Sequence, residues 1–361
     1  MCMTMMSDIS QDLLEEILSR VPITSLRAVK STCKRWKDLL NDPSFSKKYG
    51  GKRDNEFLAI MTSGSRASLM SVNLHGPRDN KDLEDPFIKQ IGELNQDQIF
   101  KVFHCDGLLL CITNEDNTRL VVWNPYLAQT RCIQPIDKFY IYDWYCLGYD
   151  KDKNHKILVV YSPMFGRIEY EIYSFLSKSW IVLSFPTDWQ ISRDECLSLK
   201  GNTYFIAYKK MEVEEVGFQE FLLCFDFTNE RFGPLLPLPF QCYNQTSLVL
   251  STVQEEQLAV LCKRCDAYET KIWITTKIEP NAVSWSYFLK FDFKVDISGG
   301  SFFVDVEEKV AVLFCINREK EKGINNKTYM IGEDGYYKEV DLGESNWCPS
   351  MCSYVPSCVQ V

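Results

Sequence analysis

Pairs of short apolar runs recur about every 50 residues along most of this chain, and this periodicity restricts the fold more than any other feature. Successive first runs begin 46 to 55 residues apart, and successive second runs begin 49 to 57 residues apart. The first runs are EFLAIM (56–61), GLLLCI (107–112), KILVVY (156–161), NTYFIA (202–207), QLAVLC (257–262) and KVAVLF (309–314). The second runs are LMSVNL (69–74), LVVWNP (120–125), YEIYSF (170–175), LLCFDF (222–227), KIWITT (271–276) and TYMIGE (328–333). Two series that keep one register indicate six repeated structural units.

Each unit also contains two weaker strand patterns. One follows the pair, as in TRCI, SWIVLSF, WSYFLKF and YYKEVDL, and one precedes the next unit, as in QIFKVFH, DECLSLK and TSLVLST. Four short strands in about 50 residues are typical of a β-propeller blade, and a 13% aromatic content favours strands. We therefore predict an all-β, propeller-like domain with six blades over residues 49–361. A two-sheet sandwich or a pair of barrels is the alternative.

The first 48 residues have a different pattern and form a predicted small all-α domain of three helices. Ser10 is placed to cap a helix over residues 10–21, with Asp12 in its first turn and Pro22 at its end. Thr24 can cap a short second helix, and a third is expected from about Ser31 to Leu40. A length of 361 residues suits one small and one large domain.

This helical segment has more apolar surface than three short helices can bury. It carries about a dozen large apolar side chains, and each stabilises by roughly 1.5–3 kcal/mol when it is fully buried. The surplus can pack on the following domain, or it can dock onto the helices of a partner protein. The pattern favours the docking module.

The segment ISQDLLEEILSRVPITSLRAVKSTCKRWKDLLNDPSFSKKY resembles an F-box. The matching positions are Asp12, Leu13, Glu16, Ile17, Leu18, Pro22, Ser25, Leu26, Cys33, Lys34, Trp36, Asp42, Pro43 and Phe45. Ile9 and Ser10 depart from the family's Leu-Pro start, which helps to contact the adaptor. The resemblance implies binding to a Skp-family adaptor. The expected contact residues are Leu13, Leu14, Ile17, Leu18, Pro22, Leu26, Val29, Cys33, Trp36 and Leu39.

The second domain resembles the plant F-box-associated domain. The similar segments are HCDGLLLCI (104–112), VVWNPYLAQTR (121–131), LGYDKDKNHKIL (147–158), EIYSFLSKSW (171–180), LKGNTYFIA (199–207) and LCFDFTNERFGPLLPLP (223–239). That family likeness implies a kelch-like domain that recognises a substrate protein. The double glycine of strict kelch blades is missing, since Gly299 and Gly300 form the only such pair within the repeats.

Residue types that carry chemistry are sparse. His75, His104 and His155 lack metal-ligand spacing, and Cys262 and Cys265 form a lone C-x-x-C motif, to which Cys348, Cys352 and Cys358 could in principle add the second ligand pair of a zinc site. No phosphate-binding glycine loop or nucleophile motif is found. We therefore expect no catalytic residue, no metal and no cofactor.

Composition narrows the partners and the compartment. A formal net charge of −9 argues against a nucleic-acid partner. The 15 cysteines are odd in number, and several end apolar runs, which favours reduced, buried thiols. The sequence has no signal-peptide pattern and no apolar stretch long enough for a membrane helix. We expect a cytoplasmic or nuclear protein without membrane partners.

Together these features predict a non-enzymatic substrate receptor of a Skp-cullin-F-box ubiquitin ligase. The Skp adaptor would link the chain to cullin and RING subunits, and the propeller would hold an unknown target protein. Trp144, Trp189 and the loop over residues 209–220 are candidates for the target site, whereas Trp123, Trp180 and Trp273 fit buried strand positions. A scaffold that binds Skp outside a ligase, a propeller enzyme and a glycan-binding propeller are the alternatives.

Overall fold

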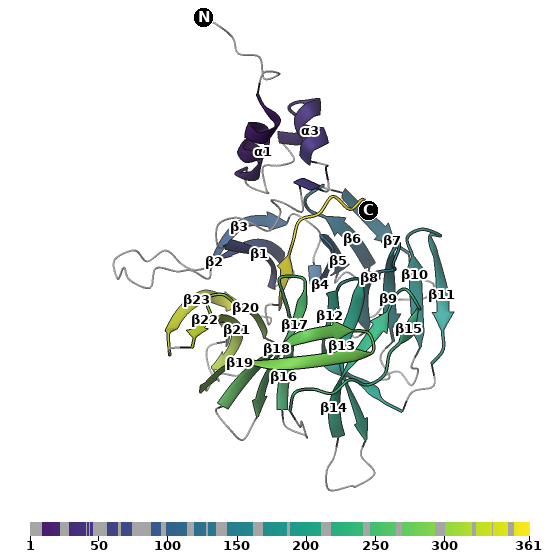
Figure 1. Cartoon of the computed structure of the whole chain (residues 1–361), viewed down its shortest axis with the longest axis vertical. Coiled ribbons are helices and arrows are strands. Elements are labelled where there is room, and N and C mark those ends of the chain that lie inside the picture. The colour runs from purple at the N-terminus through teal and green to yellow at the C-terminus, as the bar shows by residue number, and fades with distance from the viewer. Residues whose placement is uncertain are drawn as a thin grey trace, which may run out of the picture.

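The structure is a computed structural model that describes most of the chain. The described residues are 9–21, 29–40, 42, 44–45, 56–63, 66–73, 88–94, 99–113, 119–127, 129–134, 143–161, 169–185, 188–210, 218–240, 246–264, 269–292, 300–319, 323–333, 335–345 and 350–361. They form a small helical part at one end and a set of four-stranded sheets (Figure 1).

The helical part contains α1 (Gln11–Ser19) and α3 (Lys34–Leu40). Ser10 caps α1 as predicted, because its hydroxyl accepts a hydrogen bond of 3.3 Å from the backbone N–H of Leu13. Pro22, Leu26 and most of the expected middle helix lie outside the described residues. Within the described ranges, neither helix has the length and apolarity needed to cross a membrane.

Six antiparallel sheets of four strands form the larger domain. The first three, in spatial order, are β24 (Ser350–Tyr354), β1 (Glu56–Ser63), β2 (Arg66–Asn73) and β3 (Ile88–Leu94); β4 (Ile99–Cys105), β5 (Leu108–Thr113), β6 (Arg119–Asn124) and β7 (Gln129–Ile133); and β8 (Trp144–Tyr149), β9 (His155–Val160), β10 (Tyr170–Ser174) and β11 (Ser179–Leu183). The other three are β12 (Gln190–Leu199), β13 (Asn202–Lys210), β14 (Phe218–Asp226) and β15 (Arg231–Phe232); β16 (Thr246–Val253), β17 (Gln257–Arg264), β18 (Glu269–Glu279) and β19 (Ala282–Asp292); and β20 (Ser301–Asp305), β21 (Val310–Glu319), β22 (Gly323–Gly332) and β23 (Tyr337–Ser345). We call them blades 1 to 6 in this order.

The first strand of each blade contacts the first strands of the two neighbouring blades. The contacts run from β24 to β4, β8, β12, β16 and β20, and then back to β24, so the ring is closed. A closed ring of blades is a propeller, which confirms the predicted class and the six blades and leaves no place for the sandwich or the barrels.

The repeat period is confirmed in detail. The first apolar run of every pair forms the second strand of a blade, and the second run forms the third strand. Strands β5 and β9 are buried at every position, because neighbouring blades cover both faces of the sheets to which they belong. The weaker patterns form the exposed outer strands and the first strands around the axis.

One strand comes from the far end of the chain. β24 pairs with β1 in antiparallel register, with Leu58 opposite Tyr354, and thereby completes blade 1. The apolar periodicity did not predict this strand, and Cys352 within it was noted only as a possible partner of the C-x-x-C motif. In Figure 1, β24 and the tail after it appear in yellow beside the earliest strands.

Apolar residues fill the spaces between blades and so account for the stacking. One cluster joins blades 2 and 3 through Leu110, Ile112, Tyr145 and Ile157. The assignment of Trp123 to the core is confirmed, since it is buried, and Trp180 and Trp273 are half-buried. Trp144, a candidate for the target site, is instead buried, and its ring packs between blades 3 and 4.

Candidate functional site

The helical part packs onto blade 2 through a small apolar cluster. Leu14 and Leu18 of α1 are each 1% exposed. The other buried members are Leu39, Leu40, Phe45 and Tyr126, and the last of these belongs to the turn after β6. Part of the surplus apolar surface of this segment is therefore covered by the propeller of the same chain.

An adjacent face of α1 carries two large apolar side chains that face solvent. Leu13 is 53% exposed and Ile17 is 39% exposed. They are four residues apart, so they are neighbours on one helix face. Each is offset by about 100° from the buried leucine that follows it in the sequence. We call Leu13 and Ile17 the exposed strip.

The ten expected adaptor contacts therefore fall into separate environments. Leu13 and Ile17 are exposed, whereas Leu14, Leu18 and Leu39 lie inside the chain. Val29, Cys33 and Trp36 are half-buried, and Val29 and Trp36 pack against the buried cluster. Pro22 and Leu26 lie outside the described residues. Adaptor binding by this set stays a prediction.

Polar contacts fix the helical part in one orientation on blade 2. The Tyr126 hydroxyl donates a 2.8 Å hydrogen bond to the carbonyl of Leu40, at the end of α3. The Lys30 ammonium lies 4.1 Å from the centre of the Tyr126 ring and donates to the carbonyl of the same residue at 3.3 Å. Burial lowers the pKa of Lys30 to about 8, against a smaller opposing effect of Cys358. Burial also raises the pKa of Tyr126 well above its ordinary value.

The tail after β24 forms a third part of this interface. The Cys358 thiol donates a 3.3 Å hydrogen bond to the Leu40 carbonyl. The Asn124 amide donates to the carbonyls of Ser357 and Val359 at 3.0 and 2.8 Å, and its oxygen accepts from the N–H of Leu127 at 3.0 Å. Figure 1 shows the tail reaching the region of β6 and β7 below the two helices. The strand that closes the propeller thus continues into the support of the helical part.

Sequence reasoning missed Tyr126, Asn124 and Lys30 as interface residues. The signal was the Asn-Pro-Tyr sequence at residues 124–126, where β6 ends. An asparagine and a proline after a strand indicate a turn, but a tyrosine there has no local partner and only the assembled structure supplies one.

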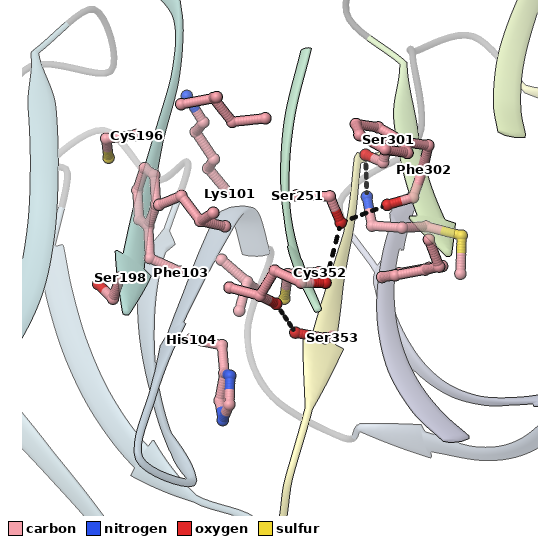
Figure 2. Close-up of a pocket in the computed structure, with 16 residues that line it drawn as sticks. Lys101, Phe103, His104, Cys196, Ser198, Ser251, Ser301, Phe302, Cys352 and Ser353 are labelled. Carbon is pink, nitrogen blue, oxygen red and sulfur yellow. Dashed lines mark hydrogen bonds between the residues drawn. The ribbon is translucent and has the colours of Figure 1, made fainter. Parts of the chain in front are cut away.

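A pocket opens on the propeller axis, where the first strands of the blades meet (Figure 2). Its hydroxyl groups are occupied by contacts between blades. Ser251 donates to the carbonyl of Phe302 at 2.5 Å, and the hydroxyls of Thr252 and Ser353 are 2.9 Å apart. Nε2 of His104 accepts a 3.0 Å hydrogen bond from the N–H of Gly107. These hydrogen bonds hold neighbouring blades together at the pocket. None of them joins a nucleophile to a general base.

The outer surface offers one further apolar area. Leu176, in the turn before β11, and Ile181 and Val182 on β11 are at least half exposed. β11 is the outermost strand of blade 3, so these side chains lie at the rim of the propeller. Trp189 is half-buried against the core between blades 3 and 4, and residues 211–217 of the candidate loop lie outside the described residues.

No group of three or more metal-ligating side chains occurs in the described part of the chain. Cys262 lies on β17 of blade 5 and Cys352 on β24 of blade 1, while Cys265 and Cys348 are not among the described residues.

Comparison with known proteins gives the same two-part division. Residues 6–48 match the F-box domain, and residues 58–361 match the F-box associated beta propeller domain. A protein of Arabidopsis thaliana named as an F-box protein, At5g51000, is 51% identical over 97% of this chain and 94% of its own length. The F-box/kelch-repeat protein At3g13680 of the same plant is 48% identical over 99% of this chain and 97% of its own length.

Among solved structures, the one titled "Structure of YjhT" matches 68% of this chain and 84% of its own chain with a TM-score of 0.44 and 9% sequence identity, which is too distant to support an argument. The two domain matches and the full-length relatives decide the family. This chain is a member of the F-box proteins that carry an F-box-associated β-propeller domain.

Proposed function

We propose that this protein is the substrate-recognition subunit of a Skp-cullin-F-box ubiquitin ligase. F-box proteins generally act as substrate receptors of such ligases. The observation that carries the proposal is the exposed strip: Leu13 and Ile17 stay in solvent although the adjacent face of α1 is buried against the propeller. An adaptor helix that covers the strip would remove this apolar surface from water.

The role of the chain is positional. The Skp adaptor connects it to cullin and RING subunits, and the propeller holds the target beside the ubiquitin-loaded enzyme. Tethering raises the effective concentration of the target's lysines, so the rate gain needs no catalytic group in this chain. A helical part anchored by Tyr126, Asn124 and the tail supports this role, because a fixed orientation keeps the target at a constant distance.

The target surface is assigned to the propeller. The rim formed by Leu176, Ile181 and Val182 is the largest described group of exposed apolar side chains on one blade and is the first surface to test. The axial pocket is the second, although its hydroxyls already bond to other parts of the chain.

The test of adaptor binding compares two double variants. Leu13→Glu with Ile17→Glu places two charges in the proposed interface, and Leu176→Glu with Ile181→Glu adds the same charge on the rim. Loss of two apolar anchors, each contributing about 1–3 kcal/mol, should weaken Skp binding by roughly 30-fold or more. The rim variant should bind Skp like the unmodified chain.

Affinity is measured by calorimetry or surface plasmon resonance with a purified Skp-family adaptor, and circular dichroism checks the fold of both variants. Unchanged affinity of the first variant would disprove the assigned interface. Cullin recovered with the unmodified chain from plant cells supports the ligase role, whereas Skp without cullin supports a scaffold outside a ligase.

A further inference from the structure

Two cysteine thiols from neighbouring blades touch beside the axial pocket. Cys146 lies on β8 of blade 3, and Cys196 lies on β12 of blade 4. Their sulfur atoms are 3.3 Å apart. The Cys196 thiol is also 3.5 Å from the carbonyl oxygen of Tyr145. The two residues belong to different sheets, so side chains hold them together and no strand pairing does.

The two thiols differ in their access to small molecules. Cys146 is 1% exposed, and burial raises its pKa well above the ordinary value, with the contact to Cys196 as a further cause. Cys196 is half-buried and lines the pocket, where Figure 2 shows it on the wall opposite Cys352. A solute in the pocket therefore reaches Cys196 first, and Cys146 is approached only through it.

We propose that Cys146 and Cys196 form a peroxide-sensitive thiol pair that closes a disulfide between blades 3 and 4. In the first step the Cys196 sulfur attacks a peroxide, and the O–O bond breaks to give a sulfenic acid at Cys196 and one molecule of water or alcohol. In the second step the Cys146 sulfur attacks the Cys196 sulfur. The S–O bond breaks, the thiol proton of Cys146 joins the departing hydroxide, and water leaves.

Geometry allows the second step with a small movement. A disulfide bond is about 2.05 Å long, so the sulfurs must approach by about 1.2 Å. β8 and β12 are neighbours in the ring around the axis, which keeps their backbones close during this approach. The product would join the first strands of two blades covalently and would remove a thiol from the pocket wall.

Within the described ranges, this pair combines a sulfur–sulfur contact with a half-buried member that lines the pocket. Cys132 is exposed on β7 and serves as the matched single thiol. Cys224 is fully buried on β14, which protects it from a dissolved oxidant. Disulfides of this kind in reducing compartments are usually transient and act as redox sensors.

The test treats the folded full-length protein with a small molar excess of hydrogen peroxide and then unfolds it in excess N-ethylmaleimide, so that buried thiols are blocked as they become accessible. We expect a linked peptide that joins Cys146 to Cys196, two hydrogen atoms lighter than the two free peptides and released by dithiothreitol. This measurement uses the unmodified chain, so its result does not depend on whether a variant folds.

Two variants test the order of the steps. Cys146→Ser should accumulate a sulfenic acid at Cys196 that dimedone traps, at several times the level in the unmodified chain. Cys196→Ser should leave Cys146 reduced, and the control Cys132→Ser should form the linked peptide at the normal yield.

Two results would overturn the proposal. One is the absence of the linked peptide at peroxide doses that oxidise Cys132 in the same sample. The other is equal dimedone labelling of Cys196 with and without Cys146. Neither result bears on Skp binding, because the assay contains no adaptor.

Discussion

Leu13 and Leu18 provide a matched test of which face of α1 is buried against the propeller and which is exposed. Both are leucines on the same helix, but Leu13 is 53% exposed and Leu18 is 1% exposed. Truncation of a buried leucine to alanine costs about 2–5 kcal/mol, because transfer energy is lost and a cavity remains. The same change at an exposed position usually alters stability by less than about 0.5 kcal/mol. Leu18→Ala should therefore destabilise the docking of α1 by about 3 kcal/mol, and Leu13→Ala should have little effect.

Hydrogen–deuterium exchange of the backbone amides in α1 and α3 measures this difference directly. A loss of about 3 kcal/mol corresponds to roughly 100-fold faster exchange wherever exchange occurs through undocking of the helices. Amides of blades 4 to 6 should be unaffected in both variants and serve as the internal control. Skp affinity should show the opposite order, with the larger loss in Leu13→Ala and the smaller loss in Leu18→Ala. Equal exchange in the two variants would refute the division of α1 into a buried face and an adaptor face.

Three further predictions concern the joint between the helices and the propeller. Gly107→Ala should release the tail (residues 355–361), because Gly107 has φ +78° and an added Cβ would lie 2.6 Å from the backbone nitrogen of Ser357. Gly335→Ala is the control for backbone strain alone, since Gly335 has φ +73° and no described atom lies within 4 Å of its added Cβ. Faster exchange of residues 355–361 in the first variant only would agree, and equal exchange would contradict the clash. Tyr126→Phe should cost about 1 kcal/mol through loss of the hydrogen bond to Leu40, seen as faster exchange in α3 while the melting temperature of the propeller is kept. The pKa of Lys30 is about 8 in the folded chain and 10.5 ordinarily, so the unfolded chain binds more protons between these pH values. The free energy of unfolding should therefore rise with pH across that window. Urea unfolding at pH 7.5 and pH 10 should show a larger rise for the unmodified chain than for Lys30→Met, and identical rises would exclude this contribution.

The sequence was sufficient for the architecture because the signal is local and repeated. Each blade contains a pair of short apolar runs, which in β5 and β9 are buried at every position, and six copies of that pair give the blade number. The start of α1 was also predictable, since a capping serine acts on an N–H only three residues away. Blade order needs no further information, because adjacent repeats stack in sequence.

The tertiary structure decided the features that join distant parts of the chain. The sequence of α1 contains two pairs of adjacent apolar residues, and nothing local shows that Leu14 and Leu18 face the propeller while Leu13 and Ile17 face solvent. The closing strand β24, its tail against Asn124, and the contact of Cys146 with Cys196 link residues that are 50 or more positions apart. Sequence periodicity describes one repeat at a time. Which faces and ends meet depends on closure of the ring, and that is a property of the whole chain.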